Sequence, residues 1–336
     1  MKAVVLHGKG EPEDLKYQDW PDPVPLGGQV VIRLKRAALN HRDVWIRKGM
    51  YAGLKFPIVL GSDGAGTVVA LGDDVPKELL NQDVVINPSM DWGNDPRVQH
   101  KFFKILGLPD DGTYAELVKV PFVYCHPKPA ALTWDEAAAL PLAGVTAYRA
   151  VVTRARVKAG DNVLVTGIGG GVSALAMQIA KKLGANVFVT SGREEKLQKA
   201  KELGASGGVN YGTEDWAQNI VAMTGGDGPD VVIDSVGGDT LAKCIDIIKP
   251  GGRIALYGAT TGLPKTVDLR RIFWKQLDIC GSTMGTQDEF AGMLKLYEDG
   301  SIKPAVDKVF ALSDAAASHR RMDEAGQFGK IILNCE

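Results

Sequence analysis

The chain has few cysteines, and none of them stands close to another. Its four cysteines, Cys125, Cys244, Cys280 and Cys335, form no Cys-x-x-Cys pair, which argues against a disulfide framework and a clustered structural zinc site. Long apolar runs are also missing. No stretch approaches the ~18 uninterrupted apolar residues that span a bilayer, and the amino end lacks the apolar core of a secretory signal. We therefore expect a cytoplasmic protein with reduced thiols and no membrane partner.

An excess of positive charge is absent as well. Lys and Arg total 39 against 40 Asp and Glu, which leaves a net charge of −1. A near-neutral chain lacks the positive field on which non-specific nucleic-acid binding depends, so we expect no nucleic-acid partner. Hydrophobic residues make up 45% and charged residues 24% of the chain, as in globular proteins. A length of 336 residues predicts two domains, at ~150 residues per domain.

Glycine is the residue type in excess. The chain holds 40 glycines in 336 residues, against roughly 7% in ordinary proteins. Residues 60–69 place glycines in a turn ahead of an apolar strand, which suits a small, tightly curved barrel. Residues 87–112 show little periodicity and are predicted to form a long excursion. The first 125 residues are therefore predicted to be β-rich.

The sequence pattern changes after Pro127. Thr133 and Glu136 have the spacing of a capping box, and three alanines follow, so a helix should begin there. From Asp161 onward, apolar strands alternate with amphipathic helices, which predicts a parallel sheet covered on both faces. The predicted strands are 163–166, 186–190, 231–234 and 253–257, and the predicted helices follow them, with one at 194–203.

Two domains follow from this change of pattern. Residues 126–263 are predicted to form the α/β domain, a Rossmann-type doubly wound parallel sheet. The tail from Pro264 is less regular and is assigned back to the first part of the chain. Residues 1–125 and 264–336 would then form one β-rich catalytic domain into which the α/β domain is inserted.

A glycine-rich turn joins the first predicted strand of the α/β domain to its helix. Glycine at such a turn lets the backbone approach a pyrophosphate, whose charge the helix N-terminus stabilises. The run departs from Gly-x-Gly-x-x-Gly, and a purely structural turn is the alternative. The candidate contacts in this turn are Gly167, Gly169, Gly170, Gly171 and Val172.

The end of the second strand indicates which dinucleotide binds. An NAD-type site carries Asp or Glu there to bind the ribose 2′-hydroxyl. This chain has Ser191-Gly192-Arg193 instead, with Lys196 one helical turn later. Ser191 can hydrogen-bond a 2′-phosphate and Arg193 can neutralise it, so we predict NADP(H) as the cofactor. The alternative is that Arg193 and Lys196 are ordinary solvated charges.

With these motifs the whole chain resembles the medium-chain dehydrogenases/reductases, in their quinone oxidoreductase-like branch. The resemblance implies a GroES-like partial barrel for the catalytic domain, a Rossmann cofactor domain, a cleft between them, and a homodimer or homotetramer. It is carried by motifs spread along the chain: residues 40–49, 61–66, 140–148, 167–173, 234–238 and 329–330.

The same resemblance allows a test for zinc. The positions at which relatives carry zinc-binding Cys, His and Cys are Asn40, Ser62 and Leu142 in this chain, and none of these is a competent zinc ligand. The region of the four-cysteine structural lobe contains no cysteine. The alternative, a replacement site built from His41, Asp63 and His100, is left open.

Without zinc, chemistry on an already activated carbonyl is favoured. Reducing a simple ketone needs the Lewis acid, whereas a quinone or enone spreads the added charge onto an oxygen that hydrogen-bond donors can stabilise. The resemblance points to Asn40, Asp43, Trp45 and Tyr51 as catalytic-site residues. Asn40 would donate to a carbonyl or ribose, Tyr51 would donate to or protonate the enolate, and Trp45 would stack on a flat substrate. The alternative for Trp45 and Tyr51 is aromatic packing in the barrel. Asp43 would orient Arg47 or the backbone.

Further cofactor contacts are implied by the resemblance and by their positions at predicted strand ends. Tyr211 would lie beside the adenosine phosphate and Lys330 would add to the 2′-phosphate site. The alternative for Lys330 is an ordinary surface lysine. Ser282 follows a strand at 277–280, which is a candidate for subunit pairing. The remaining candidates are Thr146, Ser235, Val236, Gly258 and Ala259.

The prediction is therefore an NADPH-dependent, zinc-free reductase of quinones or α,β-unsaturated carbonyls. Two alternatives remain open on sequence grounds. One is an alcohol or aldehyde dehydrogenase of the same superfamily, with a metal site not recognised from the motifs. The other is a non-catalytic NADPH-binding protein.

Overall fold

The computed structural model of the chain describes residues 1–212 and 215–336. These residues form two compact units, one made of residues 1–145 with 285–336 and the other of residues 146–284. We call them the β-rich unit and the parallel-sheet unit. Both boundaries lie further along the chain than the predicted ones at 125/126 and 263/264.

The shift of the boundaries has a structural reason at each end. Helix α2 (Trp134–Ala138) packs against strands β3 (Gln29–Ala38) and β5 (Asp63–Leu71), so it belongs to the β-rich unit. Strand β16 (Asp278–Gly281) pairs in parallel with β15 (Arg253–Leu256), so the stretch assigned to the catalytic domain from Pro264 starts inside the parallel-sheet unit.

The β-rich unit is built on a seven-stranded sheet. Its strands run in the order β10-β6-β5-β3-β18-β17, and β9 also pairs with β3. A three-stranded sheet, β2-β1-β4, and a two-stranded sheet, β7-β8, complete it among the described residues. The further strands are β1 (Lys2–Leu6), β2 (Leu15–Asp19), β4 (Ile58–Val59), β6 (Asp83–Ile86), β7 (Ser89–Met90), β8 (Lys104–Ile105), β9 (Leu117–Pro121), β10 (Cys125–Pro127), β17 (Val306–Ala311) and β18 (Lys330–Asn334).

Helices pack around these sheets, and aliphatic side chains fill the interior. The alternating strand β3 directs Ile32 and Leu34 into a core that also holds Val4 and Leu333. Gly66 is required where β3 and β5 meet, because a Cβ atom there would lie 2.1 Å from the Arg33 carbonyl oxygen. The helices are α1 (His41–Arg47), α3 (Pro141–Tyr148), within which the unit boundary falls, α9 (Gln287–Lys295) and α10 (Ala315–Asp323).

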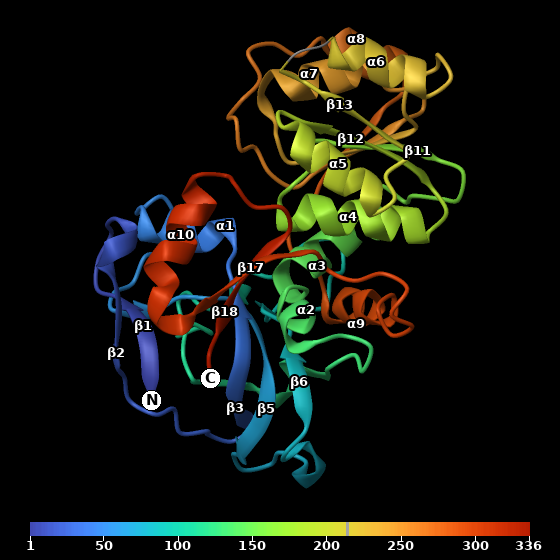
Figure 1. The fold of residues 1–336 in the computed structure, drawn as a ribbon. Coiled ribbons are helices and arrows are strands. Elements are labelled where there is room, and N and C mark those ends of the chain that lie inside the picture. Colours follow the sequence, from blue (N-terminus) through green and yellow to red (C-terminus); the bar gives the residue numbers. More distant parts are fainter. Residues whose placement is uncertain (213–214) are drawn as a thin grey trace. The chain divides into compact units, whose positions relative to one another are not determined.

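The parallel-sheet unit confirms the predicted alternation of strands and helices. Its sheet has six parallel strands in the order β13-β12-β11-β14-β15-β16, the doubly wound arrangement. Helices α4 and α5 cover one face and α6, α7 and α8 the other (Figure 1). The further strands are β11 (Asn162–Val165), β12 (Asn186–Ser191), β13 (Gly207–Asn210) and β14 (Val231–Asp234). The helices are α4 (Gly171–Lys182), α5 (Glu194–Glu202), α6 (Trp216–Met223), α7 (Gly238–Ile247), α8 (Leu269–Trp274) and the π-helical η4 (Arg149–Arg154).

Candidate functional site

A buried polar cluster occupies the place in the β-rich unit that the motifs mark as the zinc position of relatives. Its centre is Asp63 at the start of β5, which is fully buried. The Asp63 carboxylate accepts hydrogen bonds from Asn40 Nδ2 at 2.9 Å and from the Leu142 backbone nitrogen at 2.7 Å. It also forms an ion pair with Lys330 Nζ at 2.8 Å. The ammonium group of Lys330 therefore balances the charge of Asp63.

Lys330 corrects one of the sequence predictions. The pairing of β18 with β3 places Ile332 opposite Ala38, so Lys330, two residues earlier, falls beside Asn40. Its ammonium donates to Leu39 O and Asn40 Oδ1, both at 2.6 Å, as well as to Asp63. These contacts use all three of its hydrogens, and the residue is 3% exposed. Lys330 is thus a structural cation of the β-rich unit rather than a ligand for a 2′-phosphate.

Asp43 stabilises the backbone at the start of α1. Its Oδ2 atom accepts from the Asn40 backbone nitrogen and from the Tyr114 hydroxyl, each at 2.9 Å. Asp43 is fully buried, and this burial raises the pKa of its carboxyl, although the nearby Arg42 charge opposes the shift. Of the two roles predicted for Asp43, the structure supports orientation of the backbone. Arg47 pairs instead with Asp323 on α10.

Arg42 is a functional candidate that the motifs did not single out. Its Nη1 atom donates to Ser62 Oγ at 2.8 Å and to Leu106 O at 2.9 Å. Its guanidinium carbon lies 5.1 Å from the centroid of the Tyr51 ring. Both residues line a cavity of about 280 Å³, which we call the Arg42 pocket. No sequence signal set Arg42 apart, because α1 also carries His41, Asp43 and Arg47.

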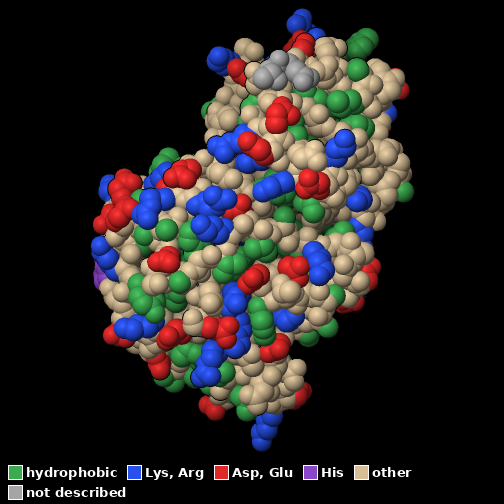
Figure 2. All heavy atoms as spheres, viewed as in Figure 1, with side chains coloured by type: hydrophobic (Ala, Val, Ile, Leu, Met, Phe, Trp, Pro, Cys, Tyr) green, Lys and Arg blue, Asp and Glu red, His purple; other side chains and the backbone are tan. Residues whose placement is uncertain are grey.

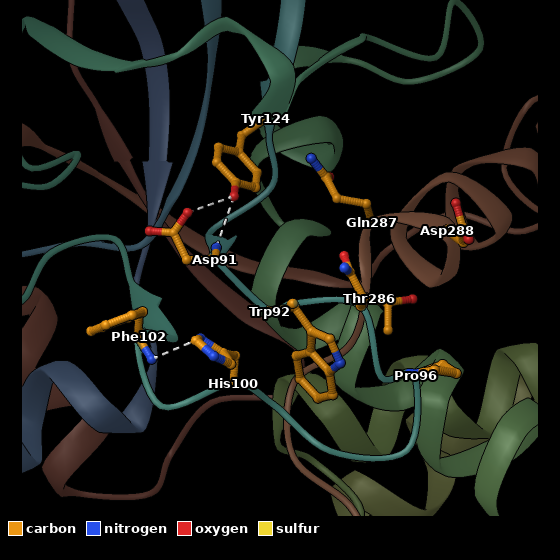
Figure 3. A pocket seen from close by; sticks show the side chains of 11 residues that line it. Asp91, Trp92, Pro96, His100, Phe102, Tyr124, Thr286, Gln287 and Asp288 are labelled. Atoms are coloured by element: carbon orange, nitrogen blue, oxygen red, sulfur yellow. Dashed lines mark hydrogen bonds between the residues drawn. The ribbon is translucent and has the colours of Figure 1, made fainter.

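A larger cavity of about 820 Å³ lies within the excursion at 87–112 and the start of α9. Trp92, His100 and Phe102 line it on the excursion, and Thr286 and Gln287 line it at α9 (Figure 3). The excursion is held by the Tyr124 hydroxyl, which accepts from the Asp91 backbone nitrogen at 2.8 Å and donates to the Asp91 carboxylate at 3.2 Å (Figure 3).

The structure also locates Trp45 and two of the candidate metal ligands, His100 and Asp63. Trp45 is half-buried on α1 and lines neither of these two cavities. His100 lines the larger cavity, whereas Asp63 is committed to Lys330, Asn40 and Leu142. Within residues 1–212 and 215–336, no group of three or more His, Cys, Asp or Glu is placed to hold a metal.

The parallel-sheet unit presents the glycine-rich turn between β11 and α4. Gly167 and Gly169 adopt positive φ angles of 61° and 128°. The Gly167 nitrogen donates to Thr190 Oγ1 at 3.1 Å, which ties the turn to the end of β12. Gly170 precedes α4, and Gly171 and Val172 form its first turn. The free backbone N–H groups of that turn are suited to bind a phosphate group.

Several predicted cofactor residues lie against this turn or at the same edge of the sheet. A Cβ atom on Gly169 would lie 2.9 Å from Lys196 Nζ, and one on Gly167 would lie 2.8 Å from a Val236 methyl group. One on Gly192 would lie 3.0 Å from the Tyr211 ring. Similar close approaches join the glycines that follow β14 and β15 to their neighbours, namely Gly258 to Ser235 and Gly237 to Ala259.

The end of β12 carries no carboxylate at the position that selects NAD. Ser191 is the last residue of this strand, is 3% exposed, and accepts from the Arg193 backbone nitrogen at 3.2 Å. Arg193 is exposed at the N-cap of α5. Elsewhere in this unit, Thr146 contacts Met284 at 3.9 Å, and the buried Ser282 hydroxyl has no hydrogen-bond partner among the described residues.

On the face seen in Figure 2, basic and acidic side chains are interspersed. Among the described residues, no helix is both long and apolar enough to cross a membrane. Together with the doubly wound sheet and its glycine-rich turn, the site geometry is that of a dinucleotide-binding dehydrogenase.

Comparison with known proteins defines the family. The alcohol dehydrogenase GroES-like domain matches residues 27–130, and the zinc-binding dehydrogenase family matches residues 171–299. A zinc-type alcohol dehydrogenase-like protein of Leptosphaeria maculans is 36% identical over 329 residues, which are 93% of this chain and 92% of that protein. The chain belongs to the medium-chain dehydrogenase/reductase superfamily, and it is an NAD(P)-dependent oxidoreductase.

Solved structures agree with this assignment and confirm the predicted fold. A crystal structure of an NAD-dependent alcohol dehydrogenase is 43% identical, with a TM-score of 0.95 and coverage of 99% of both chains. The quinone oxidoreductase of Coxiella burnetii is 30% identical, with a TM-score of 0.82, and covers 100% of this chain and 99% of its own. The match to the zinc-binding dehydrogenase family does not include residues 40, 62 and 142.

Proposed function

We propose that the protein is an NADPH-dependent reductase that transfers a hydride to a quinone or an α,β-unsaturated carbonyl without zinc. One observation carries the proposal. The positions that hold zinc ligands in relatives are Asn40, Ser62 and Leu142, and the carboxylate that contacts both Asn40 and Leu142, Asp63, is neutralised by Lys330 at 2.8 Å. Amide, hydroxyl and aliphatic side chains are a poor donor set for Zn²⁺, which prefers thiolate, imidazole and carboxylate.

The chemistry proposed for the site depends on hydrogen-bond donors. Bound NADPH supplies the hydride. The negative charge that the substrate oxygen then acquires needs donors, which Asn40 and Tyr51 can provide. Lys330 and Asp63 fix the Asn40 amide from both sides, so its remaining Nδ2 hydrogen has a defined direction. The Tyr51 hydroxyl can hold the proton that completes the reduction, and Trp45 offers an aromatic face for a planar substrate.

The choice of NADPH rests on the end of β12. Ser191 offers a hydroxyl to a 2′-phosphate, Arg193 is exposed beside it, and Lys196 lies against Gly169. A carboxylate at residue 191 would instead repel the phosphate. A second candidate function is NAD-dependent alcohol oxidation, which the 43% identity to a structure of that name favours.

We further propose that the protein forms a homodimer through the free edge of β16. This strand ends the six-stranded sheet. Several large apolar side chains near it in sequence are unusually exposed, with Trp274 at 82%, Leu269 at 68% and Phe273 at 65%. An open strand edge, together with the exposed apolar side chains of α8, offers surface that a second copy would cover.

Cofactor oxidation with a panel of substrates tests the function. NADPH oxidation is measured with a 1,4-quinone, an enone and a short aldehyde, and the reverse reaction is measured with a primary alcohol. We expect turnover with the quinone or the enone and a preference for NADPH over NADH. Turnover confined to the aldehyde and the alcohol would refute the proposal and support the alternative.

A further inference from the structure

Arg42 is a buried cation that forms no ion pair with any described residue. It is only 8% exposed, and its Nε atom is buried without a hydrogen-bond partner. Both hydrogens of Nη1 are used by the neutral oxygens of Ser62 and Leu106. Of the two buried carboxylates nearby, Asp63 is paired with Lys330. Asp43 hydrogen-bonds Asn40 and Tyr114 through Oδ2; the Arg42 charge acts on this carboxyl, but the two residues form no ion pair.

The other cation of the Arg42 pocket is already neutralised. Lys104 also lines this cavity, but its ammonium is paired with Asp110 at 2.7 Å and lies 3.9 Å from Asp91. Arg42 is therefore the cation of the pocket lining that has no ion-pair partner among the described residues, and the Asp43 carboxyl on which its charge acts is outside that lining. An unpaired buried charge costs free energy that a fold does not retain without a counter-charge. This arrangement indicates that the counter-charge belongs to a ligand.

The rest of the pocket limits the size and character of that ligand. Tyr51 stacks beside the guanidinium, and no hydrogen bond among the described residues uses its hydroxyl. Phe103, Ile105 and Leu108 make the opposite walls apolar. The volume of about 280 Å³ lies just below the ~300–1,000 Å³ of pockets for larger ligands, so a short chain fits best.

We propose that the Arg42 pocket binds a carboxylate carried by the substrate, and that the substrate is a short α,β-unsaturated carbonyl compound with a carboxylate at one end. The proposal rests on the proposed reductase function. Arg42 donates charge-assisted hydrogen bonds to the carboxylate, which leaves the Tyr51 hydroxyl for the carbonyl oxygen and the proton. In the reaction, hydride from NADPH bonds to one alkene carbon, and the proton held by Tyr51, which solvent then restores, bonds to the other. The C=C π bond is lost, and NADP⁺ and the saturated keto acid are formed.

The first test compares two enones that differ in charge. With NADPH, kcat/KM is measured for trans-4-oxo-2-pentenoate and for the uncharged 3-penten-2-one, and their ratio is taken for each variant. We expect Arg42→Gln to lower the ratio by about 10- to 100-fold, the range for loss of charge-assisted hydrogen bonds. Arg42→Lys keeps the charge and should retain part of the preference. Lys55→Gln removes a like charge from an exposed residue of the Tyr51 loop and should leave the ratio unchanged.

The second test needs no turnover and separates this inference from the proposed function. Calorimetry measures binding of 4-oxopentanoate and 2-pentanone, the saturated analogues, to the wild-type protein. We expect the acid to bind at least about 10-fold more tightly than the ketone, and Arg42→Gln to remove that difference. If neither enone reacted but this binding difference remained, the proposed reductase function would be refuted and carboxylate binding in the Arg42 pocket would stand. Equal binding of the acid and the ketone would overturn the proposal that the Arg42 pocket binds a carboxylate. An equal loss of the preference for the acid in Arg42→Gln and Arg42→Lys would overturn it as well.

Discussion

The buried Lys330–Asp63 pair makes a sharp prediction about stability. Lys330→Met removes an ammonium that is 4% exposed on its side chain and leaves the fully buried Asp63 carboxylate without its counter-charge. Breaking a buried pair in this way costs about 3–5 kcal/mol. Asp63 keeps two donors, Asn40 Nδ2 and the Leu142 nitrogen, so we expect the lower end of that range. For a unit of this size, about 3 kcal/mol corresponds to a fall in Tm of roughly 6–12 °C.

The assay is urea unfolding followed by circular dichroism, with thermal unfolding as a second measurement. The matched control is Lys35→Met, which removes the same charge from a pair with Glu336 at 2.6 Å, where the two side chains are 31% and 47% exposed. An exposed pair of this kind contributes at most about 1 kcal/mol. If Lys330→Met destabilised the protein no more than Lys35→Met, the interpretation of the cluster as a charge-balanced substitute for a metal site would be wrong.

Three further predictions concern the cofactor, acid stability and assembly. Ser191→Asp should lower the NADPH-to-NADH ratio of kcat/KM by about 10- to 100-fold, because the added carboxylate repels the 2′-phosphate; an unchanged ratio would contradict the cofactor assignment. His319 is buried beside Arg47, and its burial lowers its pKa to about 3. Because this folded-state pKa lies below the unfolded value of about 6.5, its contribution to stability is complete above pH 6.5 and is lost as the pH falls toward 3, by about 1.4 kcal/mol per pH unit. His319→Asn should flatten this loss in urea titrations between pH 6.5 and 4, and an unchanged slope would exclude His319 as its source. Trp274→Asp should convert the dimer to a monomer in light scattering with secondary structure intact, and a wild-type monomer would refute the proposed interface.

The parallel-sheet unit could be predicted because the pattern that identifies each of its strands and helices lies within that strand or helix. The strand predicted at 231–234 is β14 without change. In the β-rich unit, the capping box of Thr133 and Glu136 likewise begins α2 as predicted. Each of these features depends on residues within one element or one turn. The end of the unit was placed too early because the strand predicted at 277–280, which is β16, was assigned to the catalytic domain, and only its pairing with β15 places it in this unit.

The candidate site in the β-rich unit could be predicted only in part, because its contacts join residues that are far apart in the sequence. The motifs placed Asn40 and Asp43 at the site, but the pairing of Lys330 with Asp63 joins residues that are 267 positions apart. A lysine directly before the buried run 331–333 was a signal that could have been read as a buried cation. Arg42 was missed because burial and the lack of a counter-charge are properties of the folded chain.

Reduction of a 1,4-quinone or an enone by NADPH after exhaustive chelation tests the central claim most directly. The protein is dialysed against 1,10-phenanthroline, its zinc content is measured, and kcat/KM is compared before and after treatment. If donors from Asn40 and Tyr51 stabilise the oxyanion, kcat/KM should be unchanged at a zinc content far below one per chain. Loss of turnover on chelation, with recovery on adding Zn²⁺, would contradict the account.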